Sequence, residues 1–95
     1  MEVIFDFRQI ETMEKFYDEA VQKLHLPDYF GRNLDALYDM LTGHIHLPVT
    51  IQFFHLSPSQ LPVFEGLLST MKDAAANTEG FTFTSLISPP FSDEK

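Results

Sequence analysis

Three short stretches of the chain have the spacing or the composition of β-strands. In the first, residues 2–8, most apolar side chains fall on one side and Ile4 falls on the other, which indicates a strand with cover on both faces. The second, "HLPVTIQFF" at 46–54, is rich in β-branched and aromatic residues. The third is "FTFTSLI" at 81–87. We therefore expect three strands.

Three longer stretches between these strands repeat apolar residues every three or four positions, as amphipathic helices do. The first helix is expected at 12–24. The second has Asn33 as its N-cap and Gly43 as its C-terminal stop. The third covers 63–76, where Gly66 weakens the helix by roughly 1 kcal/mol relative to alanine.

Strands separated by helices predict an α/β protein whose parallel strands are joined by right-handed crossovers. Because three strands can cover little, we expect the helices mainly on one face of a three-stranded parallel sheet. A chain of 95 residues is typical of a single small domain. We place that domain at residues 1–88 and expect a loose C-terminal tail at 89–95, which contains two prolines.

Acidic residues outnumber basic ones by 14 to 6, which gives a formal net charge of −8. Such a charge repels nucleic acid and anionic membranes, so we expect neither as a partner, but it speeds association with a basic protein. The chain has no cysteine, which excludes disulfides and thiol catalysis. Its start lacks the pattern of a signal peptide and no segment could span a bilayer, so a cytoplasmic location is expected.

The helix expected at 33–43 divides its side chains between an apolar and an acidic face. Three leucines lie on one side of the helical wheel, and Asp35, Tyr38, Asp39 and Thr42 lie on the other. The helix dipole favours Asp35 in the first turn by about 0.3–1 kcal/mol. Asp39, one turn later, repels Asp35 by about 0.2–0.5 kcal/mol. An ordinary solvated face and an acidic site for a cationic partner both fit this pattern.

Other kinds of site find less support in the sequence. Two carboxylates one turn apart could serve a hydrolase, but an exposed helix face lacks the concave pocket that this chemistry needs. His44 and His46 share one side of an extended segment and His55 follows later, yet no dense cluster supplies the ligands of a zinc site. The serines lack a G-x-S-x-G context, and no glycine-rich phosphate loop occurs. We expect no catalytic residue, metal or cofactor.

The stretch "LPDYFGRNLDALYDMLTG" at 26–43 resembles the signature of the barstar family, the intracellular inhibitors of microbial ribonucleases. The residues that match the signature are, in chain order, Leu-Pro, an acid, Tyr29, an aromatic, Gly31, the segment "NLDAL", an aromatic, Asp39 and the segment "LTG". The order of the expected elements follows the family across about residues 2–88. The resemblance implies a three-stranded parallel sheet packed on helices. It also implies an acidic helix that enters the active site of a basic ribonuclease together with the loop before it.

The same resemblance implies roles for individual residues. Asp39 would occupy the place of the scissile phosphate and pair with the enzyme's catalytic Arg and His, while Asp35 would contact a neighbouring basic group and main chain. Tyr29 would pack against the catalytic His, and Gly31 would let the loop approach closely. The full set of partner-binding residues is then Tyr29, Phe30, Gly31, Asn33, Asp35, Tyr38, Asp39, Thr42, Gly43, His44 and Asp73.

Several positions depart from the family's pattern. Tyr38 and His44 stand where the founding member carries tryptophans, and Arg32 replaces an acid in the loop. The family's further acid on the last helix corresponds to Asp73. We predict an inhibitor, or immunity protein, of a basic ribonuclease toxin, with no small-molecule substrate and monomeric when free. The alternative is a regulatory module of the same fold that binds a non-ribonuclease partner or a different class of toxin.

Overall fold

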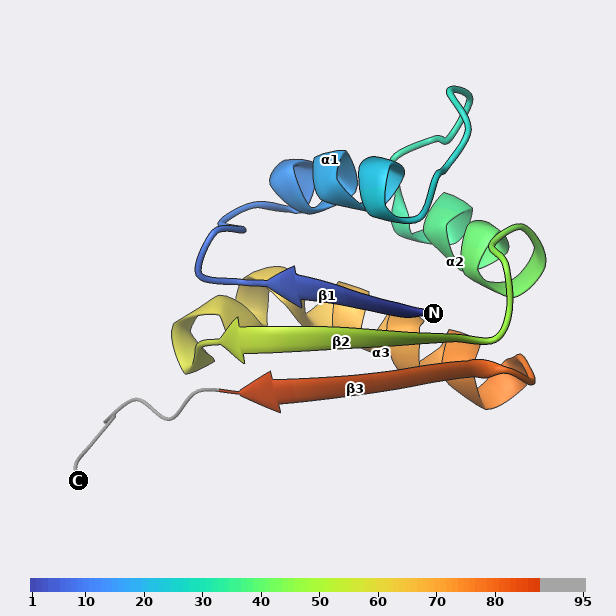
Figure 1. Cartoon of the computed structure of the whole chain (residues 1–95). Helices are drawn as coiled ribbons and strands as arrows, with labels where there is room; N and C mark the ends of the chain where they lie inside the picture. The colour runs from blue at the N-terminus through green and yellow to red at the C-terminus, as the bar shows by residue number, and fades with distance from the viewer. Residues whose placement is uncertain (88–95) are drawn as a thin grey trace.

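The structure, a computed structural model, describes residues 1–87 and has the order of strands and helices expected from the sequence (Figure 1). The elements in chain order are β1 (Glu2–Asp6), α1 (Met13–Lys23), α2 (Leu34–Gly43), β2 (Val49–Leu56), the short 3-10 turn η1 (Pro58–Gln60), α3 (Leu61–Asn77) and β3 (Phe81–Ile87). The loose tail predicted at 89–95 lies outside the described residues. Within residues 1–87, no helix combines the length and the apolar character needed to cross a membrane.

The three strands form one parallel sheet in the order β1-β2-β3, as predicted. Both crossovers move in the same direction across the sheet, and right-handed connections then place the helices on one face. Figure 1 shows α3 behind the sheet, with α1 and α2 above it. Within residues 1–87 no helix lies on the opposite face, where Ile4 on β1 is 42% exposed. The prediction that β1 is covered on both faces is therefore wrong, because α1, α2 and α3 all pack on the face of the sheet opposite Ile4.

The covered face of the sheet carries a cluster of phenylalanines. Phe5 of β1, Phe7 directly after β1 and Phe53 of β2 are at most 1% exposed. Phe5 lies 4.8 Å from Phe16 of α1 between ring centroids, and Phe7 lies 4.9 Å from Phe64 of α3. Burial of each ring stabilises the fold by about 1.5–3 kcal/mol. This core attaches α1 and α3 to the sheet. The helix α2 packs against α3 and, through Leu37 and Leu41, against the same core.

Both ends of α1 have defined caps. Thr12 accepts a hydrogen bond from the backbone N–H of Lys15 at 3.1 Å, which satisfies one free donor of the first turn. At the other end His25 takes a left-handed conformation, with φ 55°. The N–H of Leu26 then donates to the carbonyl oxygen of Val21 at 3.1 Å, in the manner of a Schellman motif. This turn directs the chain away from α1 and into the loop that precedes α2.

The third helix begins at Leu61 rather than at Val63, because a proline such as Pro62 is tolerated in the first turn of a helix. Within α3, Gly66 faces the start of α2. A Cβ atom at this position would lie 2.9 Å from Cδ1 of Leu34. The glycine that weakens the helix in isolation therefore lets α3 approach the first turn of α2 closely.

Candidate functional site

The helix α2 has the bounds and the two faces predicted from the sequence. The side chain of Asn33 caps its start by accepting a hydrogen bond from the N–H of Ala36 at 2.8 Å. Leu37 and Leu41 are fully buried against the core, and this anchors one side of the helix. The opposite side is turned outward, so the side chains of Asp35 and Asp39 are exposed.

The carboxylates of Asp35 and Asp39 are not neutralised by a basic neighbour. Among residues 1–87 the ion pairs are those of Arg8 with Asp6 and of Arg32 with Asp18, and neither involves α2. The two acids therefore repel one another at a cost of about 0.2–0.5 kcal/mol without local compensation. Their negative field remains available to a cationic partner.

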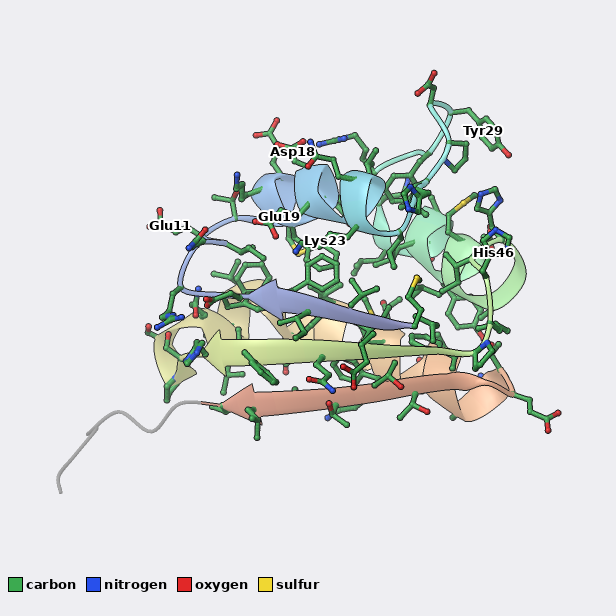
Figure 2. The ribbon with its side chains drawn as sticks, in the orientation of Figure 1. Glu11, Asp18, Glu19, Lys23, Tyr29 and His46 are labelled. Atoms are coloured by element: carbon green, nitrogen blue, oxygen red, sulfur yellow. The ribbon has the colours of Figure 1, made fainter. Side chains whose placement is uncertain are left out.

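The aromatic residues before α2 have opposite environments. Tyr29 is 77% exposed and lies near the tip of the loop between α1 and α2, far from the sheet (Figure 2). Phe30 is only 6% exposed, and its ring packs edge to face on Tyr17 of α1 with centroids 5.7 Å apart. Phe30 was expected to contact a partner, but this packing leaves almost none of its side chain accessible. Its contribution to a site would be to anchor the loop that carries Tyr29.

Gly31 lies against the cap of α2. A Cβ atom here would sit 3.2 Å from Nδ2 of Asn33 and 3.4 Å from Cβ of Ala36. The same amide nitrogen of Asn33 donates a hydrogen bond to the carbonyl oxygen of Gly31 at 3.3 Å. The small residue therefore keeps space for the capping side chain, which is a local reason for glycine at this position.

Residues of α3 lie beside the acidic face of α2, through a contact that connects the two helices. The amide Nδ2 of Asn77 donates to the hydroxyl oxygen of half-buried Tyr38 at 3.1 Å and to the backbone carbonyl of Asp73 at 2.9 Å. Asp73 is exposed one helical turn before Asn77. We use the term acidic surface for the group formed by Asp35, Tyr38, Asp39 and Thr42 of α2 with Asp73 and Asn77 of α3.

Sequence reasoning did not identify Asn77 as part of this surface. It lies one residue beyond the end of the helix predicted at 63–76. Its role depends on how α2 and α3 pack, and its hydrogen bond to Tyr38 spans 39 positions of the chain. The one available signal was Gly66, because a glycine inside an otherwise regular helix often marks a close helix–helix approach.

The end of α2 contributes three of the predicted site residues. Thr42 is half-buried, and its hydroxyl donates a hydrogen bond to the carbonyl oxygen of Tyr38 at 2.8 Å. Gly43 is the last residue of the helix. Apart from its chain neighbours and the backbone of its own helix, no atom of residues 1–87 lies within 4 Å of where its Cβ would be. His44 follows as an exposed C-cap, with its N–H bonded to the carbonyl oxygen of Met40 at 3.0 Å. Gly43 and His44 thus leave open space at this end of the acidic surface.

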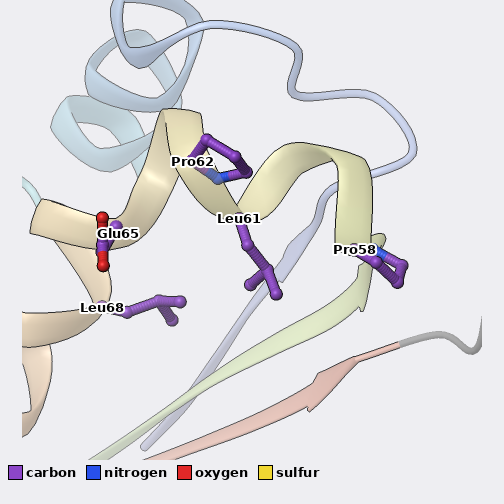
Figure 3. A pocket seen from close by; sticks show the side chains of 5 residues that line it. All are labelled: Pro58, Leu61, Pro62, Glu65 and Leu68. Carbon is purple, nitrogen blue, oxygen red and sulfur yellow. The ribbon is translucent and has the colours of Figure 1, made fainter.

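The arrangement favours contact with another protein over chemistry on a small molecule. A groove of about 410 Å³ occurs elsewhere, at the start of α3 (Figure 3), and it is lined by Pro58, Leu61, Pro62, Glu65 and Leu68. These residues do not include any of the predicted site. In the part of the chain that the structure describes, no three His, Asp or Glu side chains are grouped so as to hold a metal ion. The acidic surface therefore projects from the molecule instead of enclosing a ligand.

The fold and the exposed acidic helix together define a class of protein, the small α/β proteins with the barstar fold. The chain belongs to the Barstar family, whose model, described as "Barstar (barnase inhibitor)", matches residues 1–88. This confirms the resemblance found in residues 26–43. The family description names an inhibitor, in agreement with the prediction that the chain is not an enzyme.

A relative from Bacillus subtilis (strain 168) carries the name "Putative ribonuclease inhibitor YrdF". It is 51% identical to this chain over 49 residues, which are 52% of this chain and 54% of that protein. The chain therefore spans about half the length of this curated relative.

Proposed function

We propose that this protein inhibits a basic ribonuclease by inserting α2 and the preceding loop into the active site of the enzyme. The observation that carries the proposal is the pair of exposed carboxylates of Asp35 and Asp39 on a capped helix of a Barstar-family chain, where neither forms an ion pair within residues 1–87. A ribonuclease binds the phosphates of RNA with cationic side chains. Carboxylates held at a fixed position on a helix are able to take the place of those phosphates.

Each residue of the surface has a distinct role in this proposal. Asp39 replaces the scissile phosphate and pairs with the catalytic cations, while Asp35 contacts a neighbouring basic group. Tyr29, which is 77% exposed, supplies apolar area at the edge of the contact. The negative charge of the whole chain speeds the encounter with a basic enzyme. A complex of this kind buries roughly 1,600 Å² in total, with its binding energy concentrated in a few residues.

Inhibition assays and calorimetric titration with barnase and a panel of other basic microbial ribonucleases test the proposal. We expect tight binding to at least one enzyme and loss of its RNA cleavage. Asp39→Ala should weaken that binding most, by about 2 kcal/mol or more, which is roughly 30-fold. Asp35→Ala and Tyr29→Ala should follow. The fold, monitored by circular dichroism, should be unchanged in each variant because all three side chains are exposed.

Glu11→Ala is the matched control, because it removes one negative charge at the opposite end of α1 from the loop that carries Tyr29 (Figure 2). We expect it to change the affinity by less than about 0.5 kcal/mol. Binding of Asp39→Ala as tight as that of the parent would show that the phosphate-mimic assignment is wrong.

A second function of a different class uses the same fold as a regulatory module for a partner that is not a ribonuclease. The positive charge of Arg32 in the loop before α2 favours it, because a basic ribonuclease gains nothing from a cation in this loop. Co-expression with ribonuclease toxins in the cytoplasm separates the two functions. An inhibitor restores growth of cells that produce the toxin, whereas a regulatory module leaves them inhibited.

A further inference from the structure

A basic residue lies inside the proposed binding region. Arg32 stands between Gly31 and the N-cap residue Asn33 in a left-handed backbone conformation, with φ 53°. This conformation costs a non-glycine residue about 1–3 kcal/mol. A cation also lies unfavourably at the positive end of the α2 dipole, and it would weaken the attraction of Asp35 for a basic partner. Some other contact must offset these costs.

That contact is provided by α1. The guanidinium Nη2 of Arg32 donates a hydrogen bond to Oδ1 of Asp18 and forms an ion pair with it. On the adjacent position of α1, Tyr17 packs edge to face on Phe30 with centroids 5.7 Å apart. Two neighbouring residues of α1 therefore hold two residues of the loop, one by charge and one by apolar contact.

We infer that Asp18 is a positioning residue for the acidic surface. It draws Arg32 back onto α1 and so fixes the loop that carries Tyr29. It also balances the charge of the arginine, so that the outward face of α2 stays negative. The consequence for binding rests on the proposed function, whereas the effect on the loop and on the local potential belongs to the free protein. No feature of the sequence or of the family's signature assigns a role to Asp18.

An ordinary surface ion pair is the competing explanation. The side chains of Arg32 and Asp18 are 42% and 56% exposed, and exposed pairs typically contribute about 0–1 kcal/mol to stability. The free energy of unfolding is therefore a poor measure of this contact. The order of the loop and the electrostatic potential near α2 distinguish a positioning role from a passive one.

The first experiment uses the free protein and compares Asp18→Ala with Glu14→Ala. Glu14 lies one turn earlier on α1 and is also exposed, so its loss removes the same charge without touching the loop. Amide hydrogen exchange is measured at residues 29–32 by NMR. In Asp18→Ala we expect exchange there to be faster by roughly threefold or more, and in Glu14→Ala we expect it to be unchanged.

The electrostatic potential near α2 is measured on the same protein variants. Paramagnetic broadening of the amides of Asp35 and Asp39 is compared between a cationic nitroxide, aminomethyl-PROXYL, and the neutral carbamoyl-PROXYL. Asp18→Ala should reduce the preference for the cationic probe more than Glu14→Ala does, because it releases Arg32 toward the acidic surface. Asp18→Glu should restore both the slow exchange and the probe preference. Equal behaviour of Asp18→Ala and Glu14→Ala in both measurements would overturn the inference.

The second experiment measures association with barnase by stopped flow. Asp18→Ala should slow association roughly threefold more than Glu14→Ala at low ionic strength. Addition of Arg32→Ala to Asp18→Ala should return the rate toward that of the parent, because the released cation is then gone. If the parent does not bind barnase, the proposed function fails for that enzyme, while exchange and probe measurements still decide the role of Asp18.

Discussion

The hydroxyl of Tyr38 accepts a hydrogen bond from Asn77, and this fixes which role its own proton is left to play. A backbone carbonyl such as that of Asp73 can only accept a hydrogen bond, so the nitrogen of the Asn77 amide must be the atom that faces it. The second hydrogen of this nitrogen is donated to Tyr38 Oη at 3.1 Å. The tyrosine oxygen is therefore an acceptor in this contact. Among residues 1–87 no acceptor takes the proton of this hydroxyl, so the proposed function leaves it for an acceptor on the ribonuclease.

This geometry predicts a coupled effect of two substitutions. Tyr38→Phe should weaken binding to an inhibited ribonuclease by about 1 kcal/mol, or roughly fivefold, because one intermolecular hydrogen bond is lost. Asn77→Ala should weaken it as well, because the tyrosine ring loses its fixed position. In the Tyr38→Phe background, Asn77→Ala should have little further effect. Fully additive losses in this double-mutant cycle would contradict the coupling.

Asp6 at the end of β1 provides a pH-dependent contribution to stability. Its carboxylate accepts hydrogen bonds from the side chain of Arg8, at 2.8 Å from Nη2, and from the backbone N–H of Arg8 at 3.0 Å. Chiefly through the side-chain hydrogen bond, these contacts lower the pKa of Asp6 from 3.8 to about 2. The unfolded chain then binds the proton more tightly than the folded one. The contribution is present above pH 4 and is lost as the pH falls toward 2.

The measurement is the free energy of unfolding of the parent and of Asp6→Asn between pH 5 and pH 2. The parent should be the more stable protein near pH 5, and the difference should shrink as the pH falls. NMR titration of the carboxyl carbon of Asp6 gives its pKa directly. A midpoint at or above the ordinary value of an aspartate would contradict the prediction.

At the scale of the elements, α2 was predicted with its correct bounds because its signals are local. The cap at Asn33, the leucine face and the acidic face all follow from short-range spacing. The environment of Phe30 did not follow, because an aromatic residue in a loop has no periodic pattern to show which way it points. The predicted start of α3 at Val63 lies two residues beyond the observed start at Leu61, because the prolines of the preceding segment "SPSQLP" are typical of a loop.

The contact between α3 and α2 explains why Gly66 stands in a helix and predicts its response to substitution. Alanine at an unobstructed helical position would add roughly 1 kcal/mol of stability. At Gly66 the new Cβ would lie 2.9 Å from Cδ1 of Leu34, so that side chain must move. Gly66→Ala should therefore stabilise by clearly less than 1 kcal/mol, as measured by urea denaturation.

Two controls test whether the contact with Leu34 limits the gain of stability in Gly66→Ala. Gly43→Ala has open space around the new methyl group and should stabilise the protein by several tenths of a kcal/mol, although it lies at the helix end. In a Leu34→Ala background, Gly66→Ala should show the larger gain expected of an unobstructed site. An equal effect of Gly66→Ala in both backgrounds would show that the close approach to Leu34 does not limit it.

At the scale of the whole molecule, contacts between distant parts of the chain complete the candidate site. The ion pair of Arg32 with Asp18 spans 14 positions, and the contact of Tyr38 with Asn77 spans 39. Periodicity shows which face of each helix is apolar, but it does not show which polar residues of two helices meet. The fold class and the acidic face of α2 were thus accessible from the sequence, whereas the residues that hold the surface in place were not.

The net charge of −8 predicts how association depends on salt. Charges separated by more than about 8–10 Å are largely screened at physiological ionic strength, so long-range steering weakens there. On the proposed function, the association rate with the inhibited ribonuclease should therefore fall by roughly tenfold or more between low salt and 0.5 M salt, while the dissociation rate changes little. Glu11→Ala should lower the rate only slightly and reduce this salt dependence. If α2 enters the enzyme as proposed, Asp39→Ala should chiefly accelerate dissociation, because it would leave a cation of the enzyme buried without a partner. Association that is independent of salt would show that short-range contacts, and not the charge of the molecule, govern the encounter.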